Sequence, residues 1–330
     1  MSETLLSLRE SKAAGLGARF LAICSVTDLA NKPTRNGGSY TELTLADASG
    51  EVKFKVWADS PLRSTVESLR PGMPVRVGGL VGDYNGKPDL KADSLALLTE
   101  DERRDPALMG RLTPVSLQDP VVMARALDEV IAAIPHAGLR ATVESALTEY
   151  GERFREAVAA LGVHHAYRHG LLEHTLRMAR AARALLPLYP SVDPSLTLAG
   201  IIFHDMGKVQ EYTKLEPGMS KASFTRAGNL HGHLVLGAFI IREHATKVGL
   251  EVSLRERLEH IVLSHHTLRE FGACVTPSTP EAVLVARIDD LDAKLSAVEE
   301  ELRKAPQGQE FVPVRGIDGH LLTTPPRTTG

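Results

Sequence analysis

The chain has 330 residues, of which 43% are hydrophobic and 24% are charged, and its formal net charge is −3. This composition is that of a globular protein of about two domains, and it excludes collagen-like, disordered and membrane-embedded classes. The slightly negative charge also excludes a protein-wide attraction to nucleic acid, so any binding of a polyanion has to be local.

Residues 1–17 form an N-terminal extension with too many charged side chains for the apolar core of a signal peptide. No apolar stretch elsewhere in the sequence reaches the length that a membrane span needs. We therefore expect a cytoplasmic protein that has no membrane partner.

Residues 18–100 are predicted to form a small all-β domain, because short alternating runs are separated by turn signals such as N-G-G and Y-N-G-K. The predicted elements are strands at 19–29, 40–46 and 51–57, a helix at 61–69, and strands at 74–83 and 88–98. Five strands with a helix between the third and the fourth is the element order of an OB-fold barrel.

The third predicted strand, EVKFKVW, carries candidate nucleic-acid contacts. Alternation along a strand places Lys53, Lys55 and Trp57 together on the face away from the core. Tyr40 opens the neighbouring strand and offers a second ring on which a base can stack. Residues 18–99 hold ten Lys and Arg against nine Asp and Glu, so binding would be weak and depend on stacking. The alternative is that Trp57 only covers the end of the barrel.

The rest of the chain is predicted to be helical up to the end of the 290s, so the second unit is all-α. We divide it into a helical connector at 101–160 and a second domain at 161–304. The tail at 305–330 is rich in Pro, Gly and Thr and lacks helical periodicity, which indicates an extended appendage.

Ionisable residues interrupt the apolar segments of this second domain on several predicted helices. They are His174, His204, Asp205, His231, His233, His265, His266, Asp289, Asp290 and Asp292. Imidazole and carboxylate suit divalent metals such as Mn, Fe, Ni or Zn, and buried charges are costly unless they are paired or bound to metal. A lone histidine is more often structural, but this combination favours convergence on one site. The cysteines, Cys24 and Cys274, lie outside any C-x-x-C pattern, which argues against a thiolate site.

The order of these residues, with the segments HHAYRHGLLEHTL, AGIIFHDMGK and LSHH, resembles the HD superfamily of metal-dependent phosphohydrolases over about residues 160–300. With the OB-like domain in front, the chain is similar to the YhaM-type 3′-to-5′ exoribonucleases. That family usually has two glycines before L-L-E-H, whereas here the first is His169 and only Gly170 remains.

The resemblance implies a centre of one or two divalent ions, with manganese as the expected metal and iron, nickel or cobalt as alternatives. Asp205 would lie between the two ions. The ligands of the first ion would be His174, His204 and Asp289, and those of a second would be His233, His265 and His266.

Several neighbouring residues have two interpretations. Lys208 either contacts a phosphoryl oxygen or only complements the dipole of its helix. His164 and His165 either contact substrate in their loop, where they could protonate the leaving oxygen, or are ordinary loop histidines. Asp292 shares a helix face with Asp289 and is expected behind it. Asp290 is expected in solvent, and His231 at the periphery.

The implied activity is that of a hydrolase, a metal-dependent 3′-to-5′ exonuclease acting on single-stranded RNA and on DNA as a further substrate. A small-nucleotide phosphohydrolase or a cyclic-nucleotide phosphodiesterase is the alternative among enzymes. A non-catalytic nucleic-acid-binding protein is the alternative of another class. A homo-oligomer is a further expectation.

Overall fold

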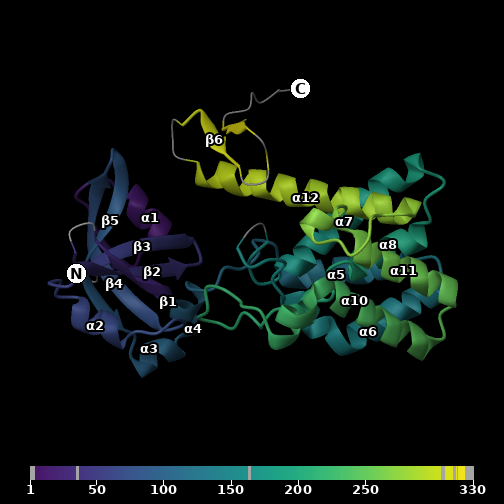
Figure 1. Ribbon diagram of the computed structural model, residues 1–330, viewed down its shortest axis with the longest axis horizontal. Coiled ribbons are helices and arrows are strands. Elements are labelled where there is room, and N and C mark those ends of the chain that lie inside the picture. Colours follow the sequence, from purple (N-terminus) through teal and green to yellow (C-terminus); the bar gives the residue numbers. More distant parts are fainter. Residues whose placement is uncertain are drawn as a thin grey trace. The chain divides into compact units, whose positions relative to one another are not determined.

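Figure 1 shows the protein as a computed structural model, which describes residues 4–34, 37–162, 165–305, 309–314, 317 and 319–323. The chain divides into an OB unit, Met1–Val115 with Leu215–Ala222, and a helical unit, Ser116–Lys214 with Ser223–Gly330. Among the described residues, no helix combines the length and the apolarity that crossing a membrane requires.

The OB unit is built on one antiparallel sheet in the order β3-β2-β1-β4-β5. Its elements are α1 (Leu8–Ala13), β1 (Arg19–Pro33), β2 (Ser39–Asp47), β3 (Gly50–Trp57), α2 (Arg63–Ser68), β4 (Pro74–Tyr84), β5 (Lys87–Leu97), α3 (Glu100–Arg104) and α4 (Pro106–Gly110). The predicted OB-fold order is confirmed. The first strand is longer than predicted, because Lys32 and Pro33 still pair with β2.

Strand alternation fixes which side chains of this sheet are accessible. Val52, Phe54 and Val56 of β3 are buried in the core of the OB unit. The residues between them point outward, as the pattern EVKFKVW predicts. The outer face of β3 is therefore available for a ligand.

The helical unit is all-α, as predicted, apart from two short strands near its end. Its elements are α5 (Pro120–Ala132), α6 (Ala137–Glu156), α7 (Gly170–Leu185), η1 (Leu186–Leu188), α8 (Pro194–Phe203), α9 (Lys208–Glu211), α10 (Arg226–Val248), α11 (Val252–Ser264), η2 (Arg269–Phe271), α12 (Pro280–Lys304), β6 (Phe311–Pro313) and β7 (His320–Leu322). The two strands pair antiparallel within the tail that was expected to be extended.

Helix α8 is the buried centre of the helical unit. Every residue from Ser195 to Phe203 is buried, which fits the sequence PSLTLAGIIF, apolar on all sides. Asp193 caps the helix by accepting hydrogen bonds from the backbone N–H groups of Ser195 and Leu196. Because the helix ends inside the protein, the two residues that follow it, His204 and Asp205, are buried as well.

Helix α10 is interrupted at Gly232, whose φ of 70° and ψ of 159° are not helical. A positive φ is readily adopted by glycine and rarely by other residues. The interruption separates His231, which is exposed, from His233, which is partly buried. It explains why two histidines only two positions apart have different environments.

Candidate metal centre

The first group of potential metal ligands comes from three helices. His174 of α7 and His204 at the end of α8 face each other, with their Nε2 atoms 3.2 Å apart. Asp289 of α12 places its Oδ1 atom 3.1 Å from the same nitrogen of His174. The structure thus brings together the three residues that the resemblance assigned to a first ion.

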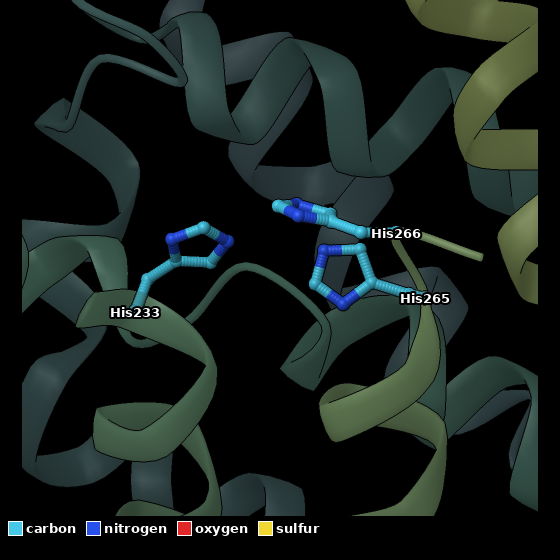
Figure 2. A group of neighbouring side chains, drawn as sticks. All are labelled: His233, His265 and His266. Atoms are coloured by element: carbon cyan, nitrogen blue, oxygen red, sulfur yellow. The ribbon is translucent and has the colours of Figure 1, made fainter. Parts of the chain in front are cut away.

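The second group consists of His233 of α10 with His265 and His266, which follow α11. Figure 2 shows the three imidazole rings gathered from these two parts of the chain. One ligand atom from each of them lies within 4.8 Å of the others. This is the second set of ligands expected from the sequence.

Asp205 lies between the two groups. Its Oδ2 atom is 3.2 Å from Nε2 of His204, on the side of the first group. Its Oδ1 atom is 3.5 Å from Nε2 of His233 and 3.7 Å from Nε2 of His265, on the side of the second. One carboxylate oxygen therefore faces each group, which is the arrangement of a bridging ligand.

Backbone carbonyls fix the orientation of two of these imidazoles. Nδ1 of His204 donates to the carbonyl of Ile201 at 2.6 Å. Nδ1 of His265 donates to the carbonyl of Val262 at 2.8 Å. Because Nδ1 is the atom that donates in each of these rings, Nε2 is the nitrogen left to face the centre.

Carboxylates hold two more of the five imidazoles. Nδ1 of His174 is 2.7 Å from Oδ2 of Asp292, as expected for an aspartate behind Asp289. Glu211 of α9 lies 3.1 Å from Nδ1 of His233 and also accepts the backbone N–H of His233 at 2.9 Å. Sequence reasoning missed Glu211, because nothing in the spacing of α9 shows that it faces α10.

The charges of the centre fit a cation. Burial would raise the pKa of Asp205, but the positive charge of Lys208 and the interactions with His204 outweigh it and hold this pKa well below its usual range. Burial lowers the pKa of His265 well below its usual value. A charged carboxylate beside imidazole nitrogens is the donor set that divalent transition metals bind.

Two buried atoms of the centre lack a hydrogen-bond partner among the described residues, namely Oδ1 of Asp205 and Nε2 of His233. Leaving such atoms unpaired in the interior is costly. A divalent ion beside these two atoms would relieve this cost, so the residues of the centre fit the metal that the sequence predicts.

His165 has a different environment from the one that the sequence suggested. It is buried, and its Nε2 atom is 3.1 Å from Oδ2 of Asp292 and 2.9 Å from Oγ of Ser296. Its Nδ1 atom contacts the hydroxyl of Tyr167 at 2.8 Å. A loop histidine that contacts substrate does not fit this placement. His165 instead supports Asp292, which in turn holds the metal-ligand candidate His174.

Asp292 is expected to affect how tightly the first ion is bound. Burial would lower the pKa of His174, but the carboxylates of Asp289 and Asp292 outweigh it and raise this pKa to about 9. Oδ2 of Asp292 holds Nδ1 of His174 at 2.7 Å. Asp292→Asn should therefore weaken binding of the first ion by about 10- to 100-fold, as is typical for a partner of a ligating histidine. Titration calorimetry with Mn²⁺ measures this.

The control for this variant is Glu299→Gln. Arg177 pairs with both Asp292, at 2.5 Å, and Glu299, at 3.0 Å, but Glu299 contacts no ligand candidate in the described structure. Equal metal affinity in the Asp292 variant and the wild type would show that this carboxylate does not position His174.

The remaining predicted residues are placed as follows. Lys208 donates from Nζ to Oδ2 of Asp205 at 2.7 Å, so its charge lies at the centre. Asp290 is exposed and pairs with Lys294, as expected for a solvated residue. His231 is exposed and lies outside both groups of ligands. His164 lies outside the described residues.

His169 occupies a position where the backbone favours glycine. Its φ is 68°, and it precedes α7 as the N-cap residue. The ring compensates for the strained backbone, because Nδ1 donates to the carbonyl of Arg155 at 2.7 Å. At Gly170, a side chain would place Cβ only 2.1 Å from the carbonyl oxygen of His165. Position 170 therefore excludes a side chain on steric grounds, whereas position 169 accepts one.

The outer face of the OB sheet carries the predicted aromatic residues. Tyr40 and Trp57 are paired across β2 and β3, with ring centroids 5.1 Å apart, and Trp57 is 47% exposed. Lys55 extends over the ring of Tyr40 and over that of Tyr84, at 5.8 and 5.9 Å. Tyr84, 61% exposed, was not predicted, since it ends a strand far from EVKFKVW in sequence.

Lys53 is less available than the strand pattern suggests. Its ammonium lies 3.4 Å from Glu42, which also pairs with Lys32 at 2.8 Å. This acidic residue on β2 offsets part of the positive charge of the face. Aromatic rings and Lys55 therefore dominate the surface.

Known proteins resemble the chain over both units. The HD domain family matches residues 171–294, and the family described as OB-fold nucleic acid binding domain matches residues 25–98. The 3′-5′ exoribonuclease YhaM of Geobacillus sp. (strain WCH70) is 32% identical over 274 residues, which cover 83% of this chain and 82% of that protein. The 3′-5′ exoribonuclease YhaM of Halalkalibacterium halodurans is 29% identical over 290 residues, 88% of each chain.

These similarities cover both features described above. One is an OB unit with an exposed aromatic face, and the other is a helical unit with two groups of metal-ligand candidates around Asp205. They confirm the resemblance that the sequence motifs indicated. The chain belongs to the YhaM family of 3′-5′ exoribonucleases.

Proposed function

We propose that this protein is a metal-dependent exonuclease that removes nucleotides from the 3′ end of single-stranded RNA. The observation that carries the proposal is the carboxylate of Asp205, which turns one oxygen to each of two groups of imidazole nitrogens. The relatives support the direction and the substrate, because they are named 3′-5′ exoribonucleases. Single-stranded DNA is a further substrate to test.

The metal is proposed to be Mn²⁺, held as two ions that share Asp205. The first ion would be bound by His174, His204 and Asp289, and the second by His233, His265 and His266. When bound, such ions polarise the phosphoryl group and lower the pKa of water, which makes it a nucleophile near neutral pH.

The residues around the ligands have separate tasks. Asp292 and Glu211 hold the rings of His174 and His233 in place. Lys208 keeps a positive charge at Asp205, 2.7 Å from its Oδ2 atom. We assign Lys208 to offset the negative charge that grows on the phosphoryl oxygens during the reaction. His165 positions Asp292 and is not assigned to the substrate.

The OB face is proposed to capture RNA upstream of the cleaved end, with bases stacked on Trp57, Tyr40 and Tyr84 and with phosphates near Lys55 and Lys53. Trp57→Ala should weaken the affinity for single-stranded RNA by about 1 to 3 kcal/mol, because one base loses its stacking partner. Hydrolysis of a dinucleotide should not change, since the metal centre alone holds its one phosphate. Fluorescence anisotropy and initial rates measure the two effects.

A matched control for Trp57 is Tyr189→Ala, which removes an aromatic ring that is 50% exposed in the helical unit. Its RNA affinity should equal that of the wild type. Equal losses on long and short substrates for the Trp57 variant would mean that this ring supports the fold and does not capture RNA.

The proposed function is tested with protein stripped of metal by a chelator. Addition of Mn²⁺ should restore hydrolysis of a single-stranded RNA oligonucleotide to mononucleotides. Cyclic nucleotides and nucleoside triphosphates should remain intact under the same conditions. Preferential hydrolysis of the small nucleotides would contradict the proposal, and so would binding of RNA without turnover in the presence of Mn²⁺.

A further inference from the structure

A pocket of the helical unit adjoins the metal centre. It lies between the end of α6 and the segment around α9, and its lining includes Arg153, Glu156, Lys208, Tyr212 and Lys214. Lys208 belongs to both places, because its ammonium reaches Asp205. A molecule that occupies this pocket therefore lies next to the group that we assign to the phosphoryl oxygens.

The pocket has an excess of positive charge. Arg153 is exposed and donates to the backbone carbonyl of Tyr212 at 3.4 Å, and no carboxylate among the described residues forms an ion pair with it. The carboxylate of Glu156 is shared by Lys214, at 3.0 Å, and by Arg168. Glu156 is thus shared by two cations, and the exposed guanidinium of Arg153 beside it suits an anion such as a phosphodiester.

Aromatic rings adjoin these cations. Tyr212 lines the pocket, and its ring centroid is 5.4 Å from that of Phe224, which is 47% exposed. Tyr212 directly follows Glu211, the carboxylate that holds His233. Cations beside aromatic rings are the combination by which proteins bind single-stranded nucleic acid without reading its sequence.

We propose that this pocket binds the nucleotide on the 5′ side of the scissile bond, with its 5′ phosphate at Arg153 and Lys214 and its base against Tyr212. The proposal rests on the exonuclease function proposed above. A 3′-terminal nucleotide that ends in a hydroxyl has no phosphate other than the scissile one. With Lys208 assigned to the scissile phosphate, Arg153 and Lys214 are left to serve a phosphate that lies upstream.

Two dinucleotides that differ in one phosphate test this directly. Adenylyl-(3′→5′)-adenosine, which has a free 5′ hydroxyl, contains only the scissile phosphate, whereas its 5′-phosphorylated form also has the upstream one. The wild type should hydrolyse the phosphorylated form with a kcat/KM about ten-fold higher, the effect of a typical charge-assisted contact. The double variant Arg153→Gln, Lys214→Gln should lose this preference and hydrolyse the unphosphorylated form at the wild-type rate.

The control is Arg180→Gln, an exposed arginine of α7 that does not line the pocket, and it should keep the full preference. The base contact is tested by Tyr212→Leu, which should lower kcat/KM for the phosphorylated dinucleotide several-fold more than for an analogue whose 5′ nucleoside is abasic. Metal content and melting temperature are measured for each variant.

The outcomes separate this proposal from the one on which it rests. Equal hydrolysis of both dinucleotides by the wild type would overturn the subsite and leave the exonuclease function standing. Equal losses on both by the double variant would also overturn it, because the cations would then support the metal centre. If the metal-loaded wild type hydrolyses neither the two dinucleotides nor longer RNA, the exonuclease function is overturned, and the subsite with it.

Discussion

Asp205→Asn should lower kcat on single-stranded RNA by about 10³-fold or more, which corresponds to about 4 kcal/mol of transition-state stabilisation. An asparagine has the same shape, but it presents an NH₂ group to one of the two groups of imidazoles that the carboxylate oxygens face. The negative charge that balances Lys208 and the ions is lost as well. We therefore expect the variant to fold and to bind RNA through the OB unit while failing to hydrolyse it.

Asp290→Asn is the matched control, because it makes the same chemical change away from the metal centre. Asp290 is an exposed residue of α12 that pairs with Lys294. Its rate should equal that of the wild type. Both proteins are compared at saturating Mn²⁺, with metal content measured by elemental analysis. Turnover of the Asp205 variant near the wild-type rate, at equal metal content, would exclude Asp205 as the shared ligand.

Gly207→Ala should destabilise the helical unit by about 3 kcal/mol and disturb the second group of ligands. A Cβ atom at position 207 would lie 2.0 Å from the carbonyl oxygen of His233 and 2.7 Å from the backbone nitrogen of Gly237. Both atoms are backbone atoms of α10, so the helix itself has to move. Because His233 moves with it, the affinity for the second ion should fall together with the stability.

The control for the glycine is Gly110→Ala in α4, where a Cβ atom would have no neighbour within 4 Å and the backbone is helical. That change should be neutral or slightly stabilising. Urea denaturation followed by circular dichroism measures the free energy of unfolding of each variant. An unchanged free energy for the Gly207 variant would mean that α10 adjusts to the methyl group without cost.

The elements that the sequence predicts well are those fixed by local pattern. The alternation of β3 and the all-apolar run of α8 each identify a buried surface without reference to the rest of the chain. His204 and Asp205 directly follow the apolar run of α8, and two ionisable side chains at the end of a buried helix are themselves a signal of function. For this reason Asp205 could be predicted from the sequence.

The supporting residues could not be predicted, because distant elements determine their environments. His165 lies three residues after Gly162, in a stretch that looks like an exposed loop, yet Asp292 and Ser296 of α12 bury it. Glu211 gains its role only because α9 packs against α10 at the break in that helix. Gly207, in the middle of HDMGK, is explained by the same contact.

The central claim, metal-dependent removal of nucleotides from the 3′ end, is tested most directly with single-stranded RNA labelled at one end or the other. With Mn²⁺ present, 3′-labelled RNA should release labelled mononucleotide from the earliest times, while 5′-labelled RNA should shorten in single-nucleotide steps. Neither should occur after chelation or in Asp205→Asn. Early release of labelled mononucleotide from the 5′-labelled RNA, internal fragments from both, or hydrolysis that persists without metal would contradict the account.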